Sequence, residues 1–188
     1  MANESKPAIQ SKGLNEKKDK ANSTAYAEVL YSQERVTKYL QGHMTLAELT
    51  NVTAPEMLEM ATYGFQMFEN GKYKEARVIF DGLVTLDPNE PYYLTALGAI
   101  YLAEEDLAQA EAYFNRAIKL EPKDLAPYVN RGEVFLRQGK VLEAAQDFKK
   151  AVEMDPQGKD PLSMRARLLA AAALETIEAA QAQSANKK

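Results

Sequence analysis

The sequence contains no cysteine and a single histidine, His43. The missing cysteines exclude disulfide bonds, thiolate catalysis and cysteine-based zinc sites, and they fit a chain kept in a reducing compartment. No run of about 18 apolar residues occurs, and the N-terminus lacks the apolar stretch of a secretory signal, so we expect neither a membrane span nor export. The sequence also lacks paired histidines, a glycine-rich phosphate loop and metal-ligand spacing. It therefore predicts no enzymatic activity, no cofactor and no metal site.

Charge of one sign is lacking as well. The 23 Lys and Arg residues nearly balance 27 Asp and Glu residues, which leaves a formal net charge of −4. Such a chain has no overall attraction to nucleic acid or to anionic lipid. With 188 residues, of which 46% are hydrophobic, it can form one ordinary globular domain and a tail. We expect a soluble cytoplasmic protein with no nucleic-acid partner and no stable membrane insertion.

What the sequence does contain is an internal repeat of 34 residues. Four columns keep this step through three copies, and four such matches are too many for coincidence. The columns are Gly64, Gly98 and Gly132; Ala76, Ala110 and Ala144; Phe80, Phe114 and Phe148; and Pro88, Pro122 and Pro156. The repeats therefore span residues 57–90, 91–124 and 125–158.

Each repeat has the pattern of a helical hairpin. In the second copy, apolar residues recur at helical spacing over 93–101, a polar turn follows at 104–106, and a second apolar stripe covers 107–118. Proline ends the second helix. Glycine inside a helix costs about 1 kcal/mol relative to alanine, so the glycine column predicts a close contact between the two helices. One hairpin cannot bury its apolar face alone, whereas three stacked hairpins can.

The segments on either side of the repeats differ in character. Residues 1–22 have almost no large apolar side chain and are predicted to be disordered. Residues 23–54 form an N-terminal helical segment, in which two Thr-x-x-Glu capping boxes, at Thr45 and Thr53, predict a short helix over about 46–51 and the start of the repeats. Asp160 and Pro161 begin a C-terminal capping helix over 159–183, and residues 184–188 form a frayed tail.

The glycine, small, aromatic and proline columns resemble the tetratricopeptide repeat. The resemblance covers the three repeats and implies an all-α fold: a right-handed α-solenoid of three helical hairpins, with N-terminal helices and a C-terminal capping helix. The sequence departs from the family at the bulky first position, where Met60, Leu94 and Tyr128 replace a common tryptophan. These replacements conserve volume and apolarity. Met60, Tyr63, Gly64 and Met67 are then expected to occupy the core positions of the first repeat.

In tetratricopeptide folds, positions 2, 5, 9 and 12 of each first helix face a ligand on the concave side. Transferred through the 34-residue register, the resemblance implies a mostly apolar peptide-binding groove. Its predicted residues are Leu58, Ala61, Phe65 and Phe68 in the first repeat; Tyr92, Thr95, Ala99 and Leu102 in the second; and Ala126, Val129, Glu133 and Leu136 in the third. The alternative for Phe65 and Phe68 is that they complete the protein's own core, as aromatic stripes usually do.

The composition of this groove favours an extended peptide with apolar anchors. It disfavours the carboxylate clamp, with which related repeats grip the acidic tails of heat-shock chaperones through lysine, asparagine and arginine. The corresponding positions here are Ala61, Phe65, Ala96, Ala126 and Asn130, which carry no charge.

Two other polar features have simple interpretations. The acidic run Glu104-Glu105-Asp106 could form a carboxylate pair or a cation site, but its place between two helices favours a solvated turn. His43 lies in a connecting loop, where a lone histidine is more often a surface or capping group than a ligand.

A second resemblance concerns the segments at residues 45–49, 53–56 and 63–76, which are similar to the class II chaperones of bacterial type III secretion. That family implies a cytoplasmic chaperone that holds an extended segment of a hydrophobic translocator protein in its groove. Ala61 departs from the family, where an aromatic residue is usual. The alternative is a generic tetratricopeptide scaffold that joins partners without protecting either.

An apolar stripe along the N-terminal segment needs a surface to cover it. We expect this stripe to mediate a homodimer. It consists of Tyr26, Val29, Leu30, Val36 and Leu40.

Overall fold

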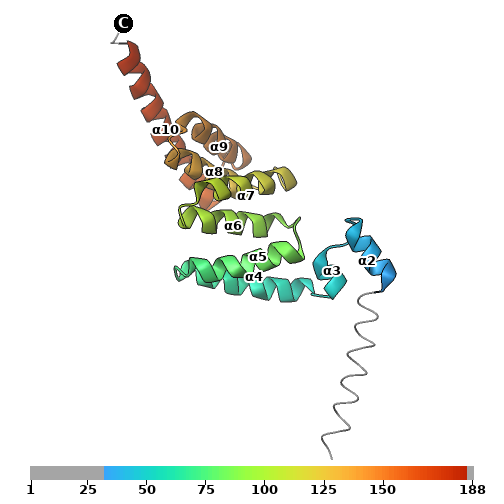
Figure 1. Ribbon diagram of the computed structural model, residues 1–188. Coiled ribbons are helices and arrows are strands. Elements are labelled where there is room, and N and C mark those ends of the chain that lie inside the picture. The colour runs from blue at the N-terminus through green and yellow to red at the C-terminus, as the bar shows by residue number, and fades with distance from the viewer. Residues whose placement is uncertain (1–31, 186–188) are drawn as a thin grey trace, which may run out of the picture. The chain divides into compact units, whose positions relative to one another are not determined.

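The computed structural model describes residues 32–185, except for the side chains at 180, 181 and 183–185. Within this range all regular secondary structure is helical (Figure 1). The chain divides into two compact units, Met1–Thr53 and Ala54–Lys188, which are described separately. No helix in the described range combines the length and the apolar character that a membrane span requires.

The described part of the first unit contains α2 (Gln33–Leu40) and α3 (Leu46–Thr50). The predicted capping box at Thr45 is present: its side chain accepts a hydrogen bond from the Glu48 amide at 3.2 Å, and the Glu48 carboxylate accepts one from the Thr45 amide at 2.7 Å. Arg35 on α2 reaches the end of α3, where it donates to the Leu49 carbonyl at 3.2 Å and to Asn51 Oδ1 at 2.8 Å. α2 itself buries none of its side chains.

The second unit is the predicted solenoid. Its helices pair into three hairpins, followed by one long helix (Figure 1). The hairpins are α4 (Ala54–Glu69) with α5 (Tyr73–Leu86), α6 (Pro91–Ala103) with α7 (Leu107–Leu120), and α8 (Ala126–Arg137) with α9 (Val141–Met154); α10 (Pro161–Ala185) follows. Each helix packs against the next along the chain, so contacts are local, as in other repeat proteins.

The glycine column marks the closest contact inside each hairpin. A Cβ atom at Gly98 would lie 2.5 Å from Cε1 of Phe114, and one at Gly132 would lie 2.5 Å from Cε1 of Phe148. Both phenylalanine rings are fully buried. The glycine therefore makes room for the aromatic ring of its own repeat, which confirms the close contact predicted from the sequence.

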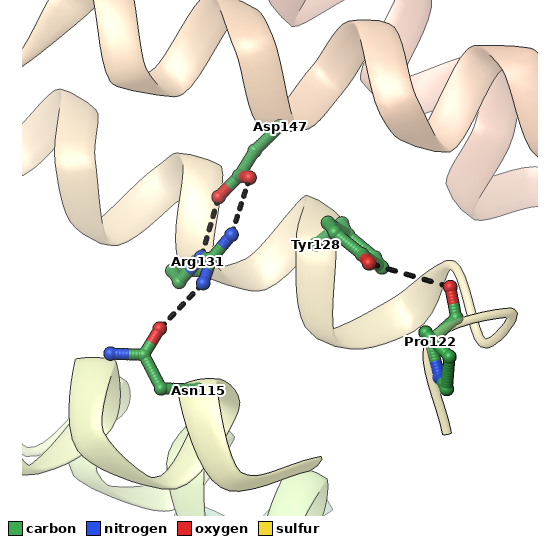
Figure 2. A network of polar contacts seen from close by, with 5 residues as sticks. All are labelled: Asn115, Pro122, Tyr128, Arg131 and Asp147. Carbon is green, nitrogen blue, oxygen red and sulfur yellow. Dashed lines mark hydrogen bonds and ion pairs between the residues drawn. The ribbon is translucent and has the colours of Figure 1, made fainter. Parts of the chain in front are cut away.

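The third repeat contains a polar network that joins three helices (Figure 2). Arg131 on α8 donates to both carboxylate oxygens of Asp147 on α9, at 2.8 and 2.7 Å, and also donates to Asn115 Oδ1 on α7. Asp147 is buried, and the hydrogen bond from Arg131 to its carboxylate raises the pKa of the guanidinium. The network ties the second and third repeats together.

One prediction about the core is wrong. Met60 and Tyr63 are 37% and 57% exposed, although the repeat pattern gave them core positions. The equivalent of Met60 in the second repeat, Leu94, has no exposed surface. Because α4 is the first helix of the second unit, no hairpin of that unit precedes it to cover this face. Gly64 and Met67 do contribute to the core as predicted.

Candidate peptide-binding surface

The first helices of the hairpins lie next to one another. α6 contacts both α4 and α8, and α8 contacts α10, whereas the second helices α5, α7 and α9 lie further apart. The row of first helices is therefore the inner side of the curve, which is where the predicted groove residues are placed.

The groove residues with the most exposed apolar surface lie on α4 and at the start of α6. Leu58 is 64% exposed, Phe65 46% and Tyr92 48%. Exposed side chains of this size usually mark a surface that binds another molecule when they lie together. Phe68, Thr95, Ala99, Ala126 and Leu136 are partly exposed.

Three predicted groove residues are instead buried in the protein's own core. Ala61, Leu102 and Val129 are 1%, 7% and 0% exposed. A side chain without exposed surface cannot contact a ligand in this conformation, so these residues support the groove from below. The 34-residue register gives the angle of a residue about its helix, but the packing of the neighbouring helices decides whether it is covered.

The two phenylalanines of the first repeat differ in their surroundings. Phe68 packs against the core around Phe80, and its ring centroid lies 5.5 Å from that of Tyr73. Phe65 stacks on the outside of Phe68, with 6.5 Å between the ring centroids. The alternative that these aromatics complete the core thus applies in part to Phe68, while Phe65 keeps nearly half of its surface for a partner.

The third-repeat end of the groove is polar. Glu133 accepts a hydrogen bond at 2.8 Å from Arg165 on α10, and the nearby Arg137 donates to the Leu102 carbonyl at 3.3 Å. Burial raises the pKa of the Glu133 carboxyl, although the charges of Arg165 and Arg137 oppose this shift. The sequence patterns did not identify Arg165, because α10 was interpreted as a capping helix outside the repeat register.

The acidic turn has structural roles. Asp106 accepts a hydrogen bond from the Gln109 amide at 3.1 Å and so caps α7, while Glu104 pairs with Arg77 at 3.2 Å. His43 is exposed in the loop between α2 and α3. Across the described residues, no group of three or more His, Asp and Glu side chains is placed to hold a metal ion.

The sequence matches the tetratricopeptide repeat family over residues 97–169. The fold is that of a tetratricopeptide-repeat solenoid. The match begins in α6 and continues 11 residues beyond the third repeat, well into α10. No curated protein matches the sequence.

Solved structures with this fold include chaperones of type III secretion. A type III secretion complex from Aeromonas hydrophila has a TM-score of 0.70 and 23% identity, covering 76% of this chain and 97% of the other. The translocator chaperone SycD of Yersinia enterocolitica has a TM-score of 0.64 and 24% identity, covering 68% of this chain and 97% of SycD. Another tetratricopeptide domain, from Spaghetti (RPAP3) bound to an HSP90 peptide, has a TM-score of 0.56 and 26% identity, covering 64% of this chain and 95% of that domain. At these identities the likeness concerns the fold.

Proposed function

We propose that this protein is a cytoplasmic chaperone of type III secretion that binds an extended apolar segment of a translocator protein. The observation that carries the proposal is the exposed apolar surface formed by Leu58, Phe65 and Tyr92 on the inner helices. It is supported by solved structures of the same fold, in which SycD is bound to a peptide of the translocator YopD and PcrH to the chaperone-binding region of PopD.

The chaperone acts by covering its client, and no bond is made or broken. Burying an apolar side chain of the client stabilises the complex by about 1.5–3 kcal/mol for each fully buried anchor. Two or three anchors on Leu58, Phe65 and Tyr92 are enough for a specific complex once the cost of ordering the peptide is subtracted. While the segment is bound, its apolar surface is withdrawn from water and from other chains.

The charge pattern of the surface favours this client over an acidic peptide tail. The positions that would form a carboxylate clamp hold only uncharged side chains, of which Ala61 is buried and Phe65 is an exposed aromatic. The HSP90 peptide bound by the Spaghetti domain, SRMEEVD, carries three carboxylate side chains. A peptide of that kind would find no cation at these positions.

The test is the solubility of a translocator protein co-expressed with this chain. Phe65→Glu introduces a charge into the apolar surface without removing a buried contact, so the translocator should lose its protection and aggregate. Val78→Glu is the matched control, because Val78 is 73% exposed on α5 of the same repeat but does not belong to the predicted groove.

Equal amounts of soluble translocator with wild type, Phe65→Glu and Val78→Glu would refute the proposed surface. A scaffold is the second candidate function, and the same experiment separates it. A client that is soluble without this chain needs a scaffold at most, whereas a client that aggregates without it needs a chaperone.

The proposal includes a homodimer formed through the N-terminal apolar stripe. Tyr26, Val29 and Leu30 lie outside the described residues. Of the other two members, Val36 is half-buried and Leu40 is 77% exposed. The exposed Leu40 is available for a second copy.

A further inference from the structure

The long helix α10 occupies the place of the first helix in a fourth repeat. Ala166 lies 34 residues after Gly132 and continues the column of Gly64, Gly98 and Gly132. It has no exposed surface, and α10 contacts α8 as α8 contacts α6. The family match to residue 169 follows the same register.

The second helix of this fourth repeat is missing. In the three complete hairpins the turn between helices places Gly71, Glu105 or Gly139 at a positive φ of 72°, 63° or 74°. The next member of this column is Ala173, which lies inside α10. Alanine strongly favours the helix and disfavours a positive φ, so α10 continues straight where the earlier hairpins fold back. Figure 1 shows its C-terminal part extending past α8 and α9.

An apolar groove remains where the second helix would have packed. It lies between α9 and α10 and has a volume of about 600 Å³. Leu142 and Leu174 on its walls are 61% and 54% exposed. None of its lining residues belongs to the predicted peptide-binding surface, so this is a separate site.

The side chains of α9 that face this groove differ from their counterparts in the earlier repeats. Arg77 on α5 pairs with Glu104 of the next hairpin, and Glu111 on α7 accepts a hydrogen bond from Gln138 of the next hairpin at 3.0 Å. The third member of this column is Ala145, which lines the groove. Charged contacts to a following hairpin have thus been replaced by a small apolar surface, and an apolar helix is the partner that fits.

We propose that this groove binds α10 of a second copy of the chain. The second helix of a hairpin runs antiparallel to the first, and two copies of α10 related by a two-fold axis perpendicular to them are antiparallel too. Such an interface is self-complementary, so each α10 fills the groove of the other copy. Ala170 and Ala171 on the groove wall allow the two helices to approach closely.

The charges around the groove agree with this partner. Lys149 and Arg167 are the charged residues of the lining, and both are cationic. Glu178 is exposed on α10, one turn beyond Leu174 on the same side of the helix. With the two-fold axis near Ala171 to Leu174, Glu178 of one copy lies beside Lys149 of the other. Opposite charges at both edges favour the antiparallel alignment.

Sedimentation of the full chain over a range of concentrations tests this interface. Leu174→Arg should weaken self-association by roughly 100-fold or more, because it buries an unpaired charge in the contact. Leu168→Arg is the matched control: Leu168 is a leucine of the same helix, 72% exposed, that does not line the groove. Lys149→Glu and Glu178→Lys should each weaken association, and the double variant should restore it.

Three results would overturn the inference. The first is a wild-type chain that sediments as a monomer at every concentration. The second is an identical effect of Leu174→Arg and Leu168→Arg, and the third is a double charge exchange that fails to restore association. If Leu40→Arg dissociates the copies while every α10 variant leaves their mass unchanged, the N-terminal stripe alone holds them together. Translocator binding is measured separately, so the outcome does not depend on the proposed chaperone function.

Discussion

Replacing Gly98 with alanine should destabilise the solenoid, although alanine is the better helix former. On propensity alone, Gly98→Ala in α6 would stabilise the protein by about 1 kcal/mol. The added Cβ, however, would lie 2.5, 2.7 and 2.9 Å from three ring atoms of Phe114, which has no exposed surface into which it could move. Overpacking of a close-packed core costs about 1–3 kcal/mol, and three contacts below 3.0 Å place this case in the upper part of that range. The net expectation is a loss of about 1–2 kcal/mol.

Urea unfolding followed by circular dichroism measures this loss. Gly82→Ala is the control, since a Cβ at Gly82 in α5 meets no atom within 4 Å and should stabilise the protein by up to about 1 kcal/mol. Combining Gly98→Ala with Phe114→Leu should show a favourable coupling, because the smaller side chain relieves the contact. A Gly98→Ala protein as stable as the wild type, or more stable, would refute the assignment of the glycine column to helix contact.

Two further predictions concern charged groups of the third repeat. Arg131→Met leaves the buried Asp147 carboxylate without its partner and should cost about 3–5 kcal/mol in urea unfolding, most of it recovered by the double variant Arg131→Met/Asp147→Leu; equal stability of the single and double variants would contradict this. Because burial raises the pKa of Glu133 above its ordinary value of 4.5, folding favours the protonated carboxyl, and this contribution to stability is lost as the pH rises through the raised pKa. Glu133→Gln should therefore be more stable than wild type at pH 7, with the difference vanishing below about pH 4.5 in parallel melts; a less stable variant at pH 7 would show that the ion pair with Arg165 outweighs burial.

The sequence was informative wherever a residue's environment repeats with the chain. The spacing of glycine, alanine and phenylalanine predicted three hairpins, and the polar run at 104–106 predicted the turn between α6 and α7. Asp160 and Pro161 predicted the start of α10, where Asp160 Oδ1 accepts a hydrogen bond from the Leu162 amide at 2.7 Å. These signals are local, since they concern residues on one helix or on two consecutive helices.

The candidate site was predicted less completely, because exposure depends on neighbours distant in the sequence. The register placed Phe65 and Val129 at equivalent ligand-facing positions, yet Phe65 is half exposed and Val129 fully buried. The pairing of Arg131 with Asp147 was also missed, since neither residue type recurs at its position in the other repeats. Side chains that occur once in a repeat protein leave no periodic signal.

By itself, the sequence determined the helices, their pairing into hairpins and the order of the hairpins, because backbone propensity and local apolar spacing act between residues close along the chain. Only the tertiary structure decided which faces of those helices remain uncovered: the outer side of α4, the inner surface around Phe65 and Tyr92, and the groove between α9 and α10. Coverage is a property of the neighbouring element, and the first and last helices of a solenoid lack one of the neighbours that every internal helix has.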